Sequence, residues 1–446
     1  MNRDAAFNVR AGLPAFVAEC YFGGVGCPAQ FKGQGNPAKA GPYSGQDILT
    51  STTPASKIAL MRKHIVDRAQ QIPSFIVMDV IDRAVEMQKD GEDVIILAVG
   101  EPDFPTPKCI VAAGQKALRS GKTKYTHSLG IPELREAIAQ EYFKKYKVNV
   151  SPDQIIITPG TSPAMFLCFS AILDPGDEII VSDPGYACYP NMIEYLHGKA
   201  ITVPVFEKEG FQLEPEAVKE KVSKRTKAVI INSPSNPTGL LLDPARMKKI
   251  ASLGHLVISD EIYHGLVYEG KEHSILEYTG NAIVLNGFSK RYAMTGWRVG
   301  YCIVPKEFAR PLQKVAQNFF ISTADFAQWA ALAAIKHAEP EVEKMRKIFD
   351  KRRKFTVARL RELGFGITRE PVGAFYVLAN AQKFCKDSYK FAFEILESAK
   401  VGVTPGEDFG KNARGYIRFS YAADIKRIEQ GLNRIQLFLQ DRKNEK

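Results

Sequence analysis

The chain has 446 residues, 45% of them hydrophobic and 24% charged, which is typical of a soluble globular protein with two domains, and it has no uninterrupted apolar run near the length of a membrane span. Its 60 Lys and Arg residues exceed its 49 Asp and Glu residues, giving a net charge of +11, but the excess is scattered and no zinc-ligand spacing or nucleic-acid motif accompanies it, so we expect neither a nucleic-acid nor a metal site. The seven cysteines form no CxxC pair, which favours free thiols in a reducing cytoplasm over a disulfide framework.

Residues 1–56 differ in composition from the rest of the chain. They are rich in Gly, Pro, Ala and Ser and show no sustained helical or strand period. A signal peptide is disfavoured because Glu19 interrupts the weakly apolar stretch that follows Arg10. We therefore predict a disordered leader, or a translation start assigned too far upstream, with Met61 as the true start.

From about residue 57, helical patterns alternate with short apolar runs. Most of these runs are continuous and β-branched, as expected of strands that are buried on both faces of a sheet. Helical segments separate several of them, which predicts an α/β architecture. The seven strand candidates are Ile155–Thr158, Glu178–Ser182, Ala200–Val205, Lys227–Asn232, His255–Ser259, Ala282–Asn286 and Val299–Val304.

A long charged amphipathic stretch follows the strand region. It runs from Glu339 to Leu363 and is followed by Gly364, which predicts a helix with a glycine stop. We expect this helix to lead from the sheet domain into a second, smaller unit. That unit should contain Ala374–Leu378 and Tyr416–Ser420 as strands.

Small and aromatic residues follow the first two strand candidates, at the point where open parallel sheets bind their ligands. After Ile155–Thr158 comes Gly160-Thr161-Ser162-Pro163, a helix start whose free N–H groups suit a phosphate, although many strand-to-helix turns look similar. After Glu178–Ser182 comes Tyr186, which could stack on a planar ring or simply pack under a loop.

The later strands are followed by polar and charged residues. Asn236 lies in an Asn-Pro-Thr-Gly turn that could be a simple connector, whereas Asp260 ends a buried strand, where a carboxylate is costly unless it faces a cation. Lys290 follows Ala282–Asn286, and Arg298 precedes Val299–Val304. If that last strand runs antiparallel to the others, Arg298 joins the same edge. Packing could explain each residue alone, but their convergence on one sheet edge predicts a functional site.

These motifs resemble the fold-type I, class I aminotransferases, which depend on pyridoxal 5'-phosphate (PLP), and in particular the aspartate aminotransferase-like branch. The most specific part is Ser289-Lys290 with Arg298 eight residues later, inside a Met-Thr-Gly-Trp-Arg stretch. The resemblance covers roughly residues 65–438. The supporting motifs are Gly100-Glu-Pro-Asp-Phe, Asn236-Pro-Thr-Gly, Asp260-Glu-Ile-Tyr263 and Arg418-Phe-Ser.

The resemblance implies a fold and a reaction. The fold would be a seven-stranded, mostly parallel sheet sandwiched by helices in residues 106–338, with a smaller α+β domain formed by residues 57–105 and 339–446. The reaction would move an amino group between an L-amino acid and a 2-oxo acid by a ping-pong mechanism. A PLP-dependent C–S β-lyase on the same fold is the alternative, because one scaffold serves several reactions.

The resemblance also implies roles around the cofactor ring. Lys290 would form the internal Schiff base and then, as a free amine, carry the proton between the substrate and the cofactor. Asp260 would pair with the pyridine nitrogen, and Tyr186 would stack on the ring. Asn236 and Tyr263 would hydrogen-bond the phenolic oxygen.

Further roles concern the phosphate and the substrate. Arg298, the hydroxyls of Ser162 and Ser289, and the backbone N–H groups of Thr161 and Ser162 would hold the phosphate. Tyr125 would reach the phosphate of the neighbouring subunit, which implies a homodimer with shared sites. Arg418 would clamp the α-carboxylate of the substrate beside the Gly100 backbone, with Tyr186 and Asn236 nearby.

The chain departs from the family pattern at the ring and at the phosphate turn. Tyr186 stands where many relatives have Trp, and the turn after the first strand carries Thr161 and Ser162 instead of a double glycine. No clear second cation is found for a dicarboxylate side chain, which puts aspartate specificity in doubt. A non-catalytic regulator on the same fold is disfavoured, because residues 1–56 show no helix-turn-helix pattern.

Overall fold

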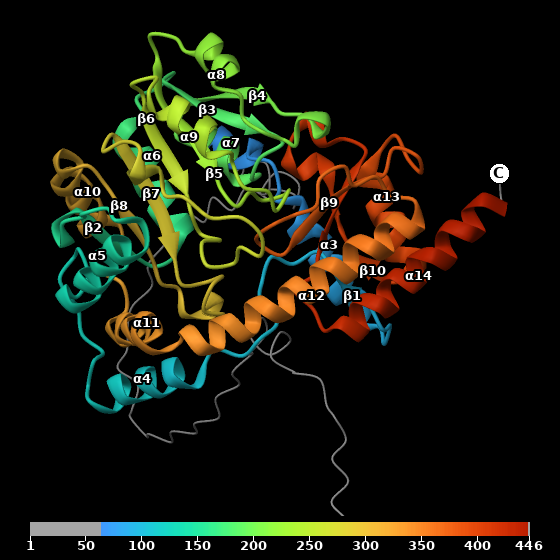
Figure 1. The fold of residues 1–446 in the computed structure, drawn as a ribbon, viewed down its shortest axis with the longest axis horizontal. Coiled ribbons are helices and arrows are strands. Elements are labelled where there is room, and N and C mark those ends of the chain that lie inside the picture. The colour runs from blue at the N-terminus through green and yellow to red at the C-terminus, as the bar shows by residue number, and fades with distance from the viewer. Residues whose placement is uncertain (1–63, 445–446) are drawn as a thin grey trace, which may run out of the picture. The chain divides into compact units, whose positions relative to one another are not determined.

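A computed structural model describes residues 64–444 and contains a central sheet of seven strands (Figure 1). The spatial order is β2-β8-β7-β6-β5-β3-β4. β8 runs antiparallel to both of its neighbours, and every other pair is parallel. The strands are β2 (Ile155–Thr158), β3 (Glu178–Asp183), β4 (Lys199–Pro204), β5 (Thr226–Asn232), β6 (Leu256–Asp260), β7 (Ala282–Gly287) and β8 (Gly300–Ile303).

Helices cover both faces of this sheet, so consecutive residues of its central strands are buried. Every residue of β6 and β7 is buried. One face packs against α6 (Thr161–Ile172) and α10 (Lys306–Phe319). The other face packs against α5 (Pro132–Tyr146), α9 (Pro244–Ala251) and α11 (Asp325–His337). α4 (Lys108–Arg119), α7 (Cys188–Tyr195) and α8 (Pro215–Lys221) complete the helices around the sheet.

Segments from both ends of the described chain form a second hydrophobic core with its own small sheets. β1 (Ile95–Ile96) pairs in parallel with β10 (Val401–Gly402). β12 (Tyr416–Ser420) lies between β11 (Thr404–Pro405) and β9 (Tyr376–Asn380), antiparallel to both. The helices of this region are α3 (Ile76–Lys89), α13 (Ser388–Glu394) and α14 (Ile425–Asn444). The short helix α2 (Asp67–Gln71) precedes α3, and its Arg68 contacts Tyr195 and His197 at the end of α7.

The long helix α12 (Glu339–Leu363) leads from the large sheet toward the small ones, as Figure 1 shows in orange. Gly364 ends it in the left-handed conformation, with φ of +94°. The predicted helix with a glycine stop is therefore confirmed. The left-handed region favours glycine because it has no Cβ, so the sequence signal has a direct steric cause.

The predicted seven-stranded α/β sheet is confirmed, as is the antiparallel direction of the last strand. The prediction of Ala374–Leu378 as a strand was wrong by two residues, since β9 is Tyr376–Asn380. Ala374 has φ of +55°, which is not a strand conformation, and its N–H bonds the Leu266 carbonyl. Residues from Ile65 onward form one compact unit, and the predicted domain boundaries stay predictions. The predicted leader and the Met61 start lie outside the described residues.

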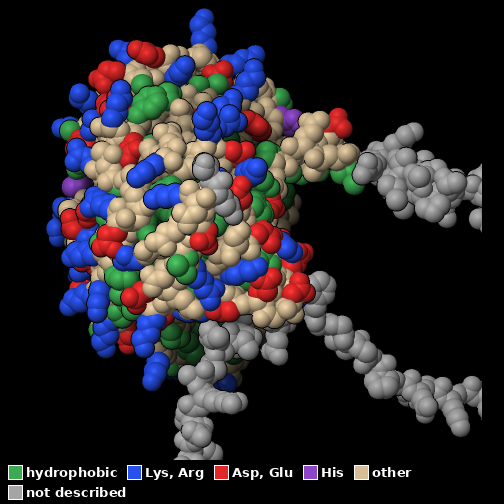
Figure 2. All heavy atoms as spheres, turned by 90° about the vertical axis from the view of Figure 1, so that its right-hand side faces the viewer, with side chains coloured by type: hydrophobic (Ala, Val, Ile, Leu, Met, Phe, Trp, Pro, Cys, Tyr) green, Lys and Arg blue, Asp and Glu red, His purple; other side chains and the backbone are tan. Residues whose placement is uncertain are grey.

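The surface of the described residues carries charges of both signs. Figure 2 shows basic and acidic side chains interspersed over the face in view. The five cysteines of the described part are free. Within residues 64–444, no helix combines the length and apolarity needed to cross a membrane.

Candidate active site

Eleven of the twelve predicted site residues line one cavity of about 220 Å³ at the carboxyl ends of the parallel strands. The twelfth, Tyr125, does not line it, and its side chain is 79% exposed. The eleven are Gly100, Thr161, Ser162, Tyr186, Asn236, Asp260, Tyr263, Ser289, Lys290, Arg298 and Arg418. They come from separate strand ends and loops, so only the fold brings them together.

An anion subsite lies where β2 turns into α6. Gly160 precedes the helix with φ of +110° and provides no side-chain cap, so the first N–H groups of α6 are left open. A Cβ on Gly160 would lie 2.4 Å from a terminal nitrogen of Arg298. Arg298 is itself left-handed, with φ of +53°, and this conformation directs its guanidinium toward the turn. Two donors, a helix start and a guanidinium, therefore meet at one point.

Asp260 is the buried acid of the cavity. It ends β6 with 4% of its surface exposed, and its carboxylate accepts hydrogen bonds from the Tyr189 hydroxyl at 2.7 Å and the Ile262 N–H at 3.2 Å. Burial raises the pKa of Asp260 to about 6, and these hydrogen bonds and the charge of Lys290 oppose the rise. A cation placed against this carboxylate would stabilise its charged form.

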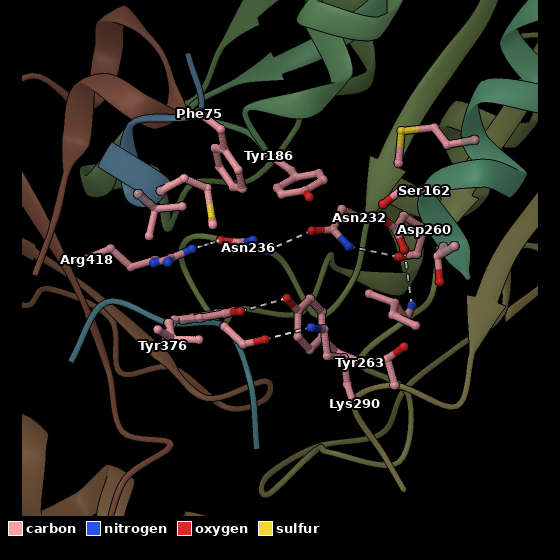
Figure 3. Close-up of a pocket in the computed structure, with 18 of the residues that line it drawn as sticks. Phe75, Ser162, Tyr186, Asn232, Asn236, Asp260, Tyr263, Lys290, Tyr376 and Arg418 are labelled. Carbon is pink, nitrogen blue, oxygen red and sulfur yellow. Dashed lines mark hydrogen bonds between the residues drawn. The ribbon is translucent and has the colours of Figure 1, made fainter. Parts of the chain in front are cut away.

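Lys290 lies across the cavity from Tyr186 and Phe75 (Figure 3). Its Nζ donates to the Gly100 carbonyl at 2.6 Å. Burial lowers the pKa of Lys290 to about 8, because the ammonium loses hydration; Glu101 opposes the shift, and Arg298 and Arg418 strengthen it. A neutral amine, which is the nucleophilic form, is therefore accessible near neutral pH.

A chain of hydrogen bonds joins the strand ends across the floor of the cavity. The Asn232 amide donates to the Asp260 carbonyl at 2.9 Å, and its oxygen accepts the Asn236 N–H at 2.7 Å. The Asn236 side-chain oxygen in turn accepts from Arg418 at 2.9 Å, as Figure 3 shows. This arrangement leaves the Asn236 NH₂ group available as a donor.

Arg418 is a buried cation that lines the cavity. It is 2% exposed and lies between the rings of Tyr376 and Phe409, with its guanidinium carbon 4.3 and 4.8 Å from their centres. Its two terminal nitrogens donate to Asn236, the Ala98 carbonyl and Thr404. Its buried Nε has no partner among the described residues. A bound anion would compensate this charge.

Sequence reasoning assigned no role to three residues that complete this network. Asn232 is the last residue of a predicted strand, and a polar residue at that position could have indicated a site residue. Tyr189 lies three residues after Tyr186, and only the structure shows its hydroxyl on Asp260. Tyr376 shares a hydrogen bond of 3.0 Å with the Tyr263 hydroxyl, a contact between residues 113 positions apart that no local pattern indicates.

These groups fit PLP. The anion subsite matches its phosphate, the buried Asp260 carboxylate matches a protonated ring nitrogen, and the Lys290 amine matches its aldehyde. The partnerless Nε of Arg418 provides a further place for a substrate carboxylate. The fold and the cavity together define the class of PLP-dependent α/β enzymes.

Comparison with known proteins agrees with this class. The family model for aminotransferase class I and II matches residues 92–435. The chain is 44% identical over 376 residues to the (5-formylfuran-3-yl)methyl phosphate transaminase of Methanocaldococcus jannaschii, covering 83% of this chain and 98% of that protein. It is 38% identical over 378 residues to the aspartate/prephenate aminotransferase of Thermus thermophilus, covering 82% and 96%.

Solved structures give the same result. A Methanococcus jannaschii crystal structure, described as similar in its active site to kynurenine aminotransferases, matches with a TM-score of 0.78 and 42% identity over 84% of this chain and all of that one. The Thermus thermophilus aspartate aminotransferase with maleate matches with a TM-score of 0.80 and 37% identity, over 83% and 98%. The chain belongs to the aminotransferase class I and II family and is a PLP-dependent aminotransferase.

The lowered pKa of Lys290 predicts how its reactivity depends on pH. In cofactor-free protein, labelling of Lys290 by an amine-selective reagent should rise with pH with a midpoint near 8, because only the neutral amine reacts. Glu101→Gln should move the midpoint to lower pH, since it removes a negative charge that favours the ammonium. Quantitative mass spectrometry of the Lys290 peptide, normalised to surface lysine peptides, measures both values. A midpoint near 10.5 would show that burial does not lower the pKa of Lys290. An unchanged midpoint in Glu101→Gln would show that the charge of Glu101 does not affect this pKa.

Proposed function

We propose that the enzyme exchanges an amino group between an L-amino acid and a 2-oxo acid in two half-reactions, a ping-pong mechanism, with Lys290 as the covalent anchor of PLP. The observation that carries this proposal is the position of Lys290, whose Nζ shares one cavity with a buried acid, an anion subsite and a buried arginine. When bound, PLP withdraws electrons from the α-carbon of the attached amino acid.

The cofactor would be held at three places. The Asp260 carboxylate, fixed by Tyr189 and Ile262, would keep the ring nitrogen protonated. The free Asn236 NH₂ group and the Tyr263 hydroxyl would donate to the phenolic oxygen, while Tyr186 covers one face of the ring. Arg298, Ser162, Ser289 and the Thr161 and Ser162 N–H groups would bind the phosphate.

Lys290 would also move the proton. Burial lowers the pKa of the Lys290 amine, which suits it to accept a proton. With PLP and an amino acid bound, the Lys290 Nζ would take the proton from the substrate α-carbon in one half-reaction and return a proton to the α-carbon in the other. The Gly100 carbonyl, which accepts from Nζ at 2.6 Å, marks one position of that amine.

Arg418 would fix the substrate by its α-carboxylate. Its guanidinium is held by Asn236 and the Ala98 carbonyl and stacked between two aromatic rings, so it cannot swing away to solvent. The partnerless Nε offers a donor to one carboxylate oxygen. This clamp would place the α-carbon near Lys290 and Asp260.

Replacing Asp260 with Asn should lower turnover by about 10²-fold or more while PLP stays bound, because a neutral amide does not stabilise the protonated ring nitrogen. Glu261→Gln is the matched control. Glu261 is equally buried but does not line the cavity, and burial raises its pKa to about 7, so the amide mimics its protonated form. Turnover with an amino acid and a 2-oxo acid measures the effect. Near-normal turnover of Asp260→Asn would refute the role, and production of ammonia and a 2-oxo acid without any acceptor would favour the β-lyase.

We further propose that the active unit is a homodimer to which each subunit contributes Tyr125. Tyr125 is 79% exposed and lies outside the cavity of its own subunit. The neighbouring Thr126 N–H bonds the Ser322 hydroxyl, and Ser322 follows two other exposed apolar residues, Phe319 and Ile321. Exposed apolar side chains gathered in this way are typical of a surface that meets a partner.

Mixing two inactive variants, Tyr125→Ala and Lys290→Ala, should restore activity to at most about a quarter of the wild-type level, because half of the dimers are mixed and each has one intact site. Steady-state assays after proven subunit exchange measure the recovery. Tyr389→Ala, which removes another exposed tyrosine, should stay active alone. If Tyr125→Ala is itself fully active, or if exchange restores nothing, the shared site does not exist.

A further inference from the structure

The cavity has an apolar wall that the proposed chemistry leaves unused. We define the apolar wall as Phe75, Val77, Met78, Ile81 and Val99, which line the cavity beside the polar residues described above. Four of the five come from the first turns of α3 and the residue that precedes it. One helix and the residue before it therefore provide most of this side of the site.

α3 carries apolar side chains on two neighbouring faces. Its buried stripe, which packs into a hydrophobic cluster, comprises Val77, Val80, Ala84 and Met87. Phe75, Met78 and Ile81 follow one another at a spacing of three, so they share a neighbouring face. Met78 is 41% exposed in the structure, and Phe75 and Ile81 are half-buried. All three side chains line the cavity, and Phe75 and Ile81 also pack against the hydrophobic cluster.

The start of α3 is fixed in place beside Arg418. The buried Asp408 carboxylate accepts the N–H groups of Ile76 at 2.9 Å and Val77 at 3.4 Å. At the other side, the Phe75 ring meets the Tyr186 ring edge-on, with 6.0 Å between centres and 85° between planes. In Figure 3, Phe75 and Tyr186 lie on the side of the cavity opposite Lys290 and Tyr263. The apolar wall therefore spans the region between Arg418 and Tyr186.

The proposed function, on which this inference rests, directs the substrate side chain to that wall. Of the four groups on the α-carbon, the amino group joins the cofactor, the carboxylate pairs with Arg418, and the hydrogen faces the Lys290 amine that removes it. The side chain is the remaining group and must point away from Lys290. Phe75 and Tyr186 lie on that side.

The described residues of one subunit offer the cavity no further cation for a second carboxylate. Among the described residues that line it, the cations are Lys290, Arg298 and Arg418, and each is already used by the cofactor or the α-carboxylate. Arg83 is the cation of α3 that lies nearest in sequence to the apolar wall, and it binds Glu397 and Glu86 instead. A carboxylate pressed against the apolar wall would lose hydration without gaining a partner, which is costly.

We propose that the amino donor carries a large, uncharged apolar side chain, aromatic or thioether, and that Phe75, Met78 and Ile81 select it. An aromatic ring can meet Phe75 edge-on, as Tyr186 already does, and the thioether of Met78 adapts to a ring edge. The selection acts through contact with apolar carbon, with no cation among the described lining residues left for a second carboxylate. It therefore discriminates against aspartate and glutamate more strongly than against small apolar residues.

The test is the donor half-reaction of the holoenzyme, followed by the change in absorbance of its own cofactor. No oxo acid is added, so the charge of an acceptor cannot affect the result. Phenylalanine and methionine should convert the cofactor at least about tenfold faster per unit concentration than aspartate and glutamate, the ratio typical of discrimination by an apolar pocket. Faster conversion by aspartate or glutamate would overturn the inference while leaving the proposed transamination intact.

A charge placed in the apolar wall should reverse the preference. Met78→Arg should raise the rate with aspartate relative to phenylalanine by about tenfold or more, since it supplies a cation to the second carboxylate. Ile72→Arg is the matched control, because Ile72 is also exposed and precedes α3 but does not line the cavity. An equal shift in both variants, or none in Met78→Arg, would contradict the role of the wall.

Binding of unreactive acids separates the wall from the chemistry. Calorimetry of the holoenzyme should show that 3-phenylpropionate binds more tightly than succinate. The Met78→Arg variant should show a smaller difference between the two dissociation constants. If no amino acid changes the cofactor absorbance but this binding preference is observed, the proposed function is wrong and the inference about the apolar wall is supported. If succinate binds more tightly to the wild-type enzyme, the inference about the wall is wrong.

Discussion

The site depends on the register of three parallel strands. In β5, β6 and β7, Asn232 lies opposite Asp260, and Asp260 lies opposite Leu285, so the chain leaves all three strands at one edge of the sheet. Helices pack on both faces of these strands, so a shift by one residue would exchange the side chains of the two buried faces and disrupt the packing on each. The same burial surrounds the Asp260 carboxylate and raises its pKa, so the packing that makes the fold also prepares the charge of the site.

The second half of the site comes from the ends of the described chain. Arg418 lies on β12, Gly100 follows β1, and the apolar wall begins at α3. Arg418 joins the two halves, because it donates both to Asn236 beyond the large sheet and to the Ala98 carbonyl beside the small one. Substrate recognition at this site would therefore depend on the contact between the two sheets, whereas cofactor binding would depend mainly on the large sheet.

The sequence predicts the large sheet well, because its strands are continuous β-branched runs and its loops carry specific motifs. The strand order places Lys290, Asp260 and Asn236 together as expected, and β8 brings Arg298 to the same edge. The strands β1, β10 and β11 could not be predicted, since each has only two residues and shows no period. The apolar wall was also not foreseen, because apolar residues spaced three apart on a helix indicate a core face as readily as a cavity face. The placement of Tyr189 and Tyr376 depends on tertiary contacts that leave no local signal.

The central claim is that Lys290 is the covalent anchor of the cofactor, and reduction of the holoenzyme with borohydride tests it most directly. Borohydride makes the bond between a lysine and the cofactor permanent, so digestion and mass spectrometry can locate it. We predict one modified peptide, with the reduced cofactor on Lys290, and no covalent cofactor in Lys290→Ala treated in the same way. Cofactor fixed to another lysine, or still fixed covalently in Lys290→Ala, would contradict the claim.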